Sequence, residues 1–197
     1  MFTGIIECIG TITNIEEQES NIHFTVHSSI SSLLHVDQSV AHDGVCLTVT
    51  HVQDDTHRVT AIAETLRMTA LHTWKTGTEI NLERCMPANG RFDGHIVQGH
   101  VDTVATCTEK ENAQGSWYFA FTYDTEKHKI LIVHKGSVCI NGISLTVSHV
   151  GEDWFKVAII PYTYEHTNIH SIEKGSQVNI EFDIIGKYIA QNLKSRL

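Results

Sequence analysis

The chain has 197 residues, of which 41% are hydrophobic and only 19% are charged, a composition that argues against an intrinsically disordered protein. This length suits one large domain or two small ones, and no stretch approaches the ~20 apolar residues of a membrane span. The formal net charge is −9 and the basic residues form no cluster, so neither nucleic acid nor a membrane is an expected partner.

The first half reads as short β-strands. The expected strands are rich in Val, Ile and Thr, alternate in polarity and end at turn-forming residues; they cover residues 22–26, 44–52, 59–62 and 79–82. Helical turns are expected at residues 29–34 and 65–71. The second half repeats this pattern with strands at 117–123, 136–150, 155–160 and 177–182 and a helical turn at 163–170. Many short strands at regular spacing favour closed barrels, which leave no exposed edge.

The C-terminal segment, residues 184–197, has a different pattern. Ile185, Ile189 and Leu193 recur four residues apart with Tyr188 beside them, which predicts an amphipathic helix with one apolar stripe. Such a helix either folds back on a barrel or packs against other copies of itself in an oligomer.

An internal duplication is the clearest signal in the sequence. Residues 43–50, DGVCLTVT, recur at 141–148 as NGISLTVS, which is an offset of 98 residues. Further identities follow the same offset and join Thr65, Thr69, His72, Gly77, Asn81 and Glu83 to Thr163, Thr167, His170, Gly175, Asn179 and Glu181. Two halves of this size predict two small domains, which we expect to join near residues 87–91.

The repeated motif places a small polar pair on one face of a strand. We expect its glycine to form a tight turn before the strand. Alternation then puts Cys46 and Thr48 on one face, with Val45 and Leu47 facing the core. Ser144 and Thr146 form the matching pair in the second copy. Ordinary strand residues explain one such pair, whereas its recurrence in both halves indicates two related binding sites.

Cysteine and histidine are the remaining candidates for chemistry. The five cysteines (Cys8, Cys46, Cys85, Cys107 and Cys139) are odd in number and lack framework spacing, so we expect reduced thiols in a cytoplasmic protein. Cys85 and His95 flank a glycine-rich turn, but HExxH and paired CxxC motifs are absent and no metal site is expected. His100 occupies the register of Ile5 in the first copy; it is either a surface histidine or a general acid or base.

Four motifs taken together resemble one family. They are the opening MFTGIIE, the pair GVCLTV and GISLTV, the run GHIVQGHVD at residues 94–102, and ETLRMT at 64–69. In this order they resemble the riboflavin synthases over essentially the whole chain. The resemblance implies an all-β fold: two similar six-stranded Greek-key barrels from an internal duplication, then a C-terminal α-helix. The implied domains are residues 1–95, 96–184 and 185–197, and the last of them is the helix that joins a homotrimer.

The same resemblance implies a transferase reaction at the last step of riboflavin biosynthesis. Two molecules of 6,7-dimethyl-8-ribityllumazine dismutate by transfer of a four-carbon unit, and the products are riboflavin and 5-amino-6-ribitylaminouracil. No metal or other cofactor takes part, and association with lumazine synthase is a further implied interaction. The alternative is an antenna protein of the same fold, which binds lumazine or flavin without catalysis; a purely structural barrel is a third and weaker reading.

The resemblance also assigns site residues. By position, the catalytic residues would be Phe2, Cys46, His100, Ser144 and Thr146. His100 and Thr146 would assist proton transfer, Ser144 would polarise or help deliver a nucleophile, Cys46 would line the other site, and Phe2 would pack near the reacting rings. The implied substrate-binding residues are Gly4, Ile5, Ile6, Cys46, Leu47, Thr48, Thr60, Ala61, Ile62, Ala63, Glu64, Thr65, Gly99, His100, Val101, Lys135, Ser144, Leu145, Thr146, Ala158, Ile159, Ile160, Pro161, Tyr162 and Thr163. One departure is Tyr162, which stands where the family carries a glutamate.

Overall fold

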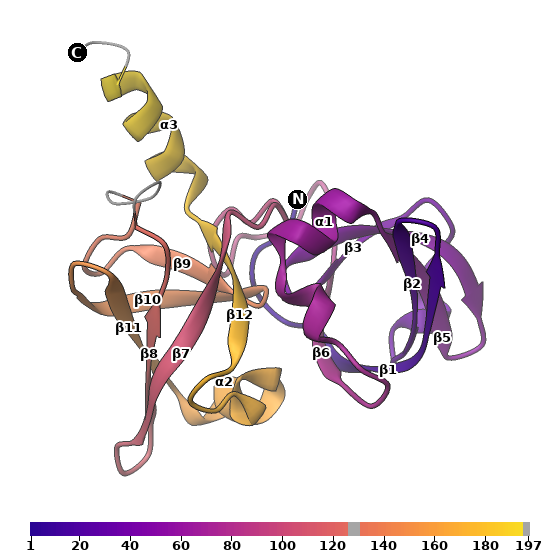
Figure 1. The fold of residues 1–197 in the computed structure, drawn as a ribbon, viewed down its shortest axis with the longest axis horizontal. Coiled ribbons are helices and arrows are strands. Elements are labelled where there is room, and N and C mark those ends of the chain that lie inside the picture. Colours follow the sequence, from indigo (N-terminus) through magenta and orange to yellow (C-terminus); the bar gives the residue numbers. More distant parts are fainter. Residues whose placement is uncertain (126–130, 195–197) are drawn as a thin grey trace.

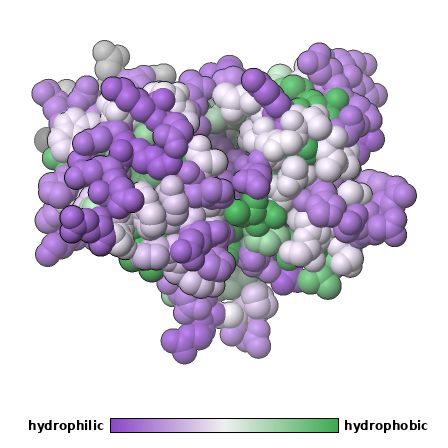
Figure 2. All heavy atoms as spheres, turned by 90° about the horizontal axis from the view of Figure 1, so that it is seen from below, coloured by the Kyte–Doolittle hydropathy of each residue, from purple (hydrophilic) through white to green (hydrophobic). Residues whose placement is uncertain are grey.

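The computed structural model describes residues 1–125 and 131–194. Two closed antiparallel barrels of six strands each lie side by side, and a C-terminal helix projects from the second barrel (Figure 1). The face seen in Figure 2 is largely hydrophilic, with hydrophobic residues in separate small patches. Within the described ranges, no helix is long and apolar enough to cross a membrane.

The first barrel has the strand order β1-β2-β5-β4-β3-β6. Its strands are β1 (Cys8–Gln18), β2 (Asn21–His27), β3 (Ser39–His42), β4 (Val45–Gln53), β5 (Thr56–Ala61) and β6 (Glu79–Arg84). Short helical turns follow β2 and β5, namely η1 (Ser31–Leu33), α1 (Ala63–Met68) and η2 (Ala70–Thr73).

The second barrel repeats this arrangement in the order β10-β11-β8-β7-β12-β9. Its strands are β7 (Thr103–Asn112), β8 (Trp117–Thr122), β9 (Ser137–Ile140), β10 (Ile143–Val150), β11 (Trp154–Ile159) and β12 (Gln177–Phe182). The helical turns α2 (Pro161–His166) and η3 (Asn168–Ser171) stand where α1 and η2 stand in the first barrel. The all-β architecture of two six-stranded barrels is therefore confirmed.

The motif glycines form the expected tight turns. Asp43 and Gly44 have φ angles of 47° and 76°, and Asn141 and Gly142 have 44° and 82°. Two consecutive left-handed residues make the type of turn that joins antiparallel strands without splaying them. One expectation needs correction, because the single strand predicted at residues 136–150 is two strands, β9 and β10, joined by the turn at Asn141.

Alternation along β4 and β10 also follows the prediction. Val45, Leu47 and Val49 are buried in the first barrel, whereas Cys46 is half-buried and Thr48 is exposed. The strand β10 has the same pattern, with Ser144 half-buried and Thr146 exposed. Each barrel fills its own interior with a separate apolar cluster, so the polar pairs face outward from both cores.

The C-terminal helix α3 (Ile184–Lys194) was predicted, and residues 195–197 of that prediction lie outside the described residues. Lys187 of α3 forms an ion pair with Asp102 at 2.8 Å, which fixes the start of the helix on the second barrel. Ile185, Ile189 and Leu193 are each more than half exposed, and they border an apolar cavity of about 500 Å³ beside the residues before β9. The stripe is thus only partly covered within one chain.

The two barrels meet along a polar seam in which several contacts occur in equivalent pairs. The Asn81 Nδ2 donates to the Asn141 carbonyl at 2.9 Å, and the Asn179 Nδ2 donates to the Asp43 carbonyl at 2.9 Å. The turn glycines also touch, because a Cβ on Gly44 would stand 2.7 Å from the backbone nitrogen of Gly142. The seam therefore relates the barrels by an approximate twofold axis.

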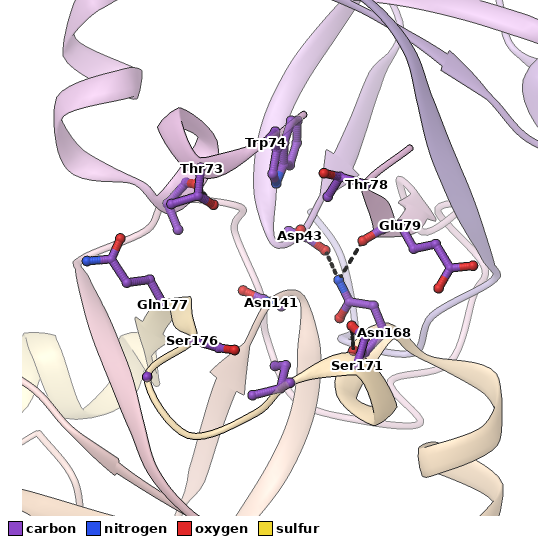
Figure 3. A pocket seen from close by; sticks show the side chains of 13 residues that line it. Asp43, Thr73, Trp74, Thr78, Glu79, Asn141, Asn168, Ser171, Ser176 and Gln177 are labelled. Carbon is purple, nitrogen blue, oxygen red and sulfur yellow. Dashed lines mark hydrogen bonds between the residues drawn. The ribbon is translucent and has the colours of Figure 1, made fainter. Parts of the chain in front are cut away.

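A cavity of about 420 Å³ opens at this seam, and both barrels line it (Figure 3). Asp43 borders it with one carboxylate oxygen, which accepts hydrogen bonds from the Asn81 backbone at 2.8 Å and from the Asn168 Nδ2 at 2.9 Å. Burial raises the pKa of Asp43 to about 7, against the lowering effect of these hydrogen bonds. None of the residues that the resemblance assigned to substrate lines this cavity.

The first barrel buries a polar network that has no counterpart among the described residues of the second barrel. The His42 Nδ1 lies 3.0 Å from the Val40 carbonyl, the His42 Nε2 lies 2.8 Å from the His57 Nε2, and the His57 Nδ1 lies 2.8 Å from the Ser31 hydroxyl. Two neutral rings satisfy this chain, since the Val40 carbonyl requires a proton on Nδ1 of His42. Burial lowers the pKa of His42 to about 3 and that of His57 to about 4.

These histidines predict a loss of stability in mild acid. The unfolded state takes up protons as the pH falls below 6.5 while the folded state does not, so the unfolding free energy declines from there towards pH 4. The double substitution His42→Ile and His57→Phe installs the residues found at the matching positions, Ile140 and Phe155. We expect it to remove up to about 4 kcal/mol of the decline between pH 7.5 and 5.

Urea unfolding of both proteins at the two pH values measures this difference. Other titrating groups are common to both proteins, so they cancel in the comparison. Equal declines for the two proteins would contradict the proposed burial of neutral histidines.

Candidate functional site

The site begins with an exchange of leading segments between the barrels. Residues 1–7 precede the first barrel and residues 96–102 precede the second. The two segments pair at the seam, where Phe2 and Val97 exchange backbone hydrogen bonds of 2.7 and 3.1 Å. Each segment then crosses to the other barrel, so that the Gly4 carbonyl accepts from the Ser144 nitrogen at 2.8 Å. The Gly99 carbonyl accepts from the Cys46 nitrogen at 2.9 Å in the same way.

This exchange sorts the expected binding residues into two sets. Ile6 packs against the apolar core of the second barrel, and Val101 packs against the core of the first. We call residues 46–48, 60–65 and 99–101 the first pocket, and residues 144–146, 158–163 and 4–6 the second pocket. That these residues bind substrate stays a prediction. Each pocket combines the motif strand of one barrel with the leading segment of the other.

Both pockets lie where a strand ladder ends. The pairing of β4 with β5 runs from Gln53 and Thr56 to Val49 and Val59, and it does not continue to residues 46–48. The pairing of β10 with β11 ends at the equivalent place, Val147 and Val157. Backbone groups of these strands are thus left unpaired with each other, which suits a flat ring that carries its own donors and acceptors.

Ser144 has a partner in the second pocket that the sequence did not indicate. The Nδ1 of His95 lies 2.6 Å from the Ser144 hydroxyl, and the backbone nitrogen of His95 donates to the Thr3 carbonyl at 3.1 Å. Burial lowers the pKa of His95, although the nearby Asp183 carboxylate acts in the opposite direction. A neutral imidazole can accept the serine proton, so this pair can activate a hydroxyl group.

Cys46 holds the corresponding position in the first pocket. Burial raises the pKa of its thiol, although a hydrogen bond with Ser39 lowers it. The protonated thiol is a weak nucleophile and a weak hydrogen-bond donor. The two pockets therefore offer different chemistry at equivalent positions, a thiol in one and a serine paired with histidine in the other.

His100 belongs to the first pocket. It follows Gly99, whose backbone contacts Cys46, and its imidazole is exposed. Thr146, with which it was expected to share proton transfer, lies on β10 in the second pocket. Within one chain the two residues stand in different pockets, so a shared role requires the pockets of different chains to meet.

Phe2 is fully buried at the seam, where it packs with Ala41, Val97 and Cys139. Phe2 was expected to pack near the reacting rings, but within one chain its side chain has no solvent-exposed surface. A Cβ on Gly99 would stand 2.9 Å from the Phe2 ring, so Phe2 packs against the leading segment where that segment crosses to the first barrel. Lys135 is exposed. It lies beside β10, because its backbone nitrogen donates to the Val147 carbonyl at 2.9 Å.

The two pockets differ at Tyr162, which stands where the first copy has Glu64. Glu64 forms an ion pair with Arg67 at 2.6 Å on the rim of the first pocket. Its counterpart Tyr162 is 68% exposed and stacks on the ring of His166 with centroids 4.1 Å apart. An aromatic surface thus replaces a carboxylate on the rim of the second pocket.

Comparison with known proteins identifies relatives over nearly the whole chain. Residues 3–85 and 98–183 each match the lumazine binding domain. Riboflavin synthase of Actinobacillus pleuropneumoniae is 43% identical over 195 residues, covering 98% of this chain and 90% of that protein. Riboflavin synthase of Bacillus subtilis (strain 168) is 40% identical over 190 residues, covering 96% of this chain and 88% of that protein.

This chain belongs to the riboflavin synthase family of enzymes. The resemblance inferred from the motifs is thereby confirmed. A solved structure, LumP complexed with riboflavin, superposes with a TM-score of 0.86 at 22% identity and covers 92% of this chain and 99% of that one. At that identity the likeness concerns the fold. Among the described residues, no group of three or more His, Cys, Asp or Glu side chains could hold a metal ion.

The crossing of Gly99 over Cys46 predicts the effect of an added methyl group. Gly99 has φ +81°, and a Cβ there would stand 2.6 Å from the Cys46 Cβ. Gly77 has φ +90° with nothing within 4 Å, so Gly77→Ala isolates the backbone cost, about 1–2 kcal/mol. We expect Gly99→Ala to cost clearly more than Gly77→Ala in urea unfolding, and equal costs would contradict the close crossing.

Proposed function

We propose that this member of the riboflavin synthase family dismutates two molecules of 6,7-dimethyl-8-ribityllumazine. One molecule donates a four-carbon unit to the other, and riboflavin and 5-amino-6-ribitylaminouracil are released. The observation that carries the proposal is the doubled pocket, in which two equivalent motif strands bear the different side chains Cys46 and Ser144. A reaction between two copies of one substrate needs two related sites that treat the copies differently.

The chemistry requires no external electron donor or acceptor. The two products together contain all the atoms of the two substrates, so the electrons also balance. The C7 methyl of lumazine is acidic because its carbanion delocalises into the ring, and a modest base therefore suffices. His100 is the proposed proton-transfer group in the first pocket, with Thr146 of a facing pocket.

Ser144 and His95 are the proposed pair for the second substrate. His95 would take a proton as the Ser144 hydroxyl, or a water held by it, adds to the electrophilic ring. The support for this role is the 2.6 Å contact between the two side chains and the lowered pKa of His95. Backbone groups of β10 and β11 beyond the end of their shared ladder would hold the polar edge of that ring.

We propose that the pockets meet across a homotrimer. The first pocket of one chain would face the second pocket of its neighbour, and this head-to-tail contact closes into a ring after three chains. The support is that His100 and Thr146 lie in different pockets of one chain and that α3 leaves an apolar stripe exposed. Holding both substrates in register would lower the activation barrier of the reaction between them by up to ~7–11 kcal/mol.

We also expect the enzyme to work in the cytoplasm, because its five cysteines are free thiols, the form that a reducing compartment maintains. Association with lumazine synthase stays a prediction, and co-sedimentation of the two proteins tests it.

A second candidate is a protein that holds lumazine or flavin without turnover. The fold likeness to LumP complexed with riboflavin favours it. Such a protein would purify with coloured ligand tightly bound, whereas an enzyme releases its product.

Mixing the protein with 6,7-dimethyl-8-ribityllumazine, without metal or cofactor, tests the dismutation. We expect about half a mole of riboflavin per mole of lumazine consumed, because two substrates give one riboflavin. His100→Ala should lower kcat by about 100-fold or more, the usual loss for a general acid or base. His51→Ala changes an exposed histidine at the far end of β4 and serves as control. Ligand binding without riboflavin formation would favour the antenna reading.

The trimer has its own test at α3. Ile189→Lys places a charge on the exposed apolar stripe, and Gln191→Lys places the same charge on an exposed polar residue of the helix. We expect Ile189→Lys to dissociate the assembly in sedimentation velocity and to abolish turnover, while Gln191→Lys does neither. An unchanged assembly in Ile189→Lys would argue against association through this stripe.

A further inference from the structure

Two buried glutamates remain outside the proposed chemistry. Glu83 lies on β6 and Glu181 on β12, at equivalent positions in the two barrels, and they are 4% and 2% exposed. Buried carboxylates are costly unless hydrogen bonds compensate them, so their partners identify their task.

Both carboxylates bind the leading segment of their own barrel. Glu83 accepts hydrogen bonds from the Thr3 nitrogen at 2.6 Å, the Thr3 hydroxyl at 2.8 Å and the Gly4 nitrogen at 3.0 Å. Glu181 accepts from the nitrogens of Gln98, Gly99 and His100 at 2.7, 2.8 and 2.9 Å. Charge-assisted bonds to several successive amides fix a backbone more firmly than neutral contacts do.

We call each glutamate with the backbone amides that it binds a clamp. The two clamps differ in how they hold one amide, that of Ile5 or His100. In the first copy the Ile5 nitrogen donates to the Thr3 hydroxyl at 3.3 Å and reaches Glu83 only through it. In the second copy the His100 nitrogen donates directly to the Glu181 carboxylate at 2.9 Å. The direct, shorter bond therefore holds the backbone of His100, whose side chain is ionisable. The bond relayed through Thr3 holds the backbone of Ile5.

The clamp also acts on the wall of the first pocket. The Gly99 nitrogen is held by Glu181 of the second barrel, while the Gly99 carbonyl accepts from Cys46 of the first. A Cβ on Gly99 would stand 2.6 Å from the Cys46 Cβ, so no room for a side chain separates this segment from β4. A carboxylate on one barrel and a strand on the other thus fix the backbone next to His100 from both sides.

We propose that Glu181 is a positioning residue, whose carboxylate sets His100 over the first pocket without touching the substrate. Glu83 performs the matching task for residues 3–5 at the second pocket. This inference rests on the proposed dismutation and names how one of its groups is placed. Side-chain amides cannot replace the carboxylates, because an amide has one acceptor oxygen and its nitrogen would face a backbone donor.

A double-mutant cycle with His100 tests the proposal. Glu181→Gln should lower kcat by about tenfold or more while KM changes by about twofold or less, the pattern of a lost transition-state interaction. In the His100→Ala background the same substitution should have little further effect, because the group that it positions is gone. Glu83→Gln is the matched control, since it removes an equivalent clamp and should lower activity by the same factor in both backgrounds.

Unfolding midpoints of all variants separate positioning from loss of fold. If Glu181→Gln does not fold, Glu181→Asp keeps the charge on a shorter side chain, and its kcat enters the same cycle. Equal loss in both His100 backgrounds, or an unchanged kcat, overturns the positioning role in a protein that makes riboflavin. A wild-type protein that makes no riboflavin overturns the proposed dismutation as well, so the two failures are distinguishable.

Discussion

The rest of the molecule depends on the pairing of two leading segments at the seam between the barrels. Phe2 and Val97 exchange hydrogen bonds there, and each segment is then held by a carboxylate of its own barrel and by a motif strand of the other. Hydrogen bonds to a fixed carboxylate are directional, so the segment has one register. Separating the barrels would therefore open both pockets at once, which makes the seam part of the site.

Duplication supplies two copies of one scaffold, and divergence at a few positions makes them unlike. At equivalent positions of the two copies, Cys46 corresponds to Ser144, Ile5 to His100, and Glu64 to Tyr162. None of these side chains is fully buried in a barrel core, so a change at these positions leaves the two barrel cores intact. In the proposed dismutation, two identical substrate molecules would thereby meet different functional groups.

Buried polar groups give the two barrels separate identities at a cost in stability. The His42 and His57 pair occurs in one barrel, where the other has Ile140 and Phe155. Asp43 on one side of the seam is an ionisable residue, whereas its counterpart Asn141 is a neutral amide. Such networks specify one arrangement because every donor must find its acceptor, and they also couple folding to protonation.

The sequence alone determined the local features. Periodicity, turn glycines and the repeat predicted two β-barrels, the turns at Gly44 and Gly142, and the outward polar pairs of β4 and β10. It did not reveal the partition into two mixed pockets, the partnership of His95 with Ser144, or the clamps at Glu83 and Glu181. These contacts join residues at least 49 positions apart in the sequence. Only the closure of both barrels and their meeting at the seam bring them together, because periodicity reports a residue's own strand and not what lies across from it.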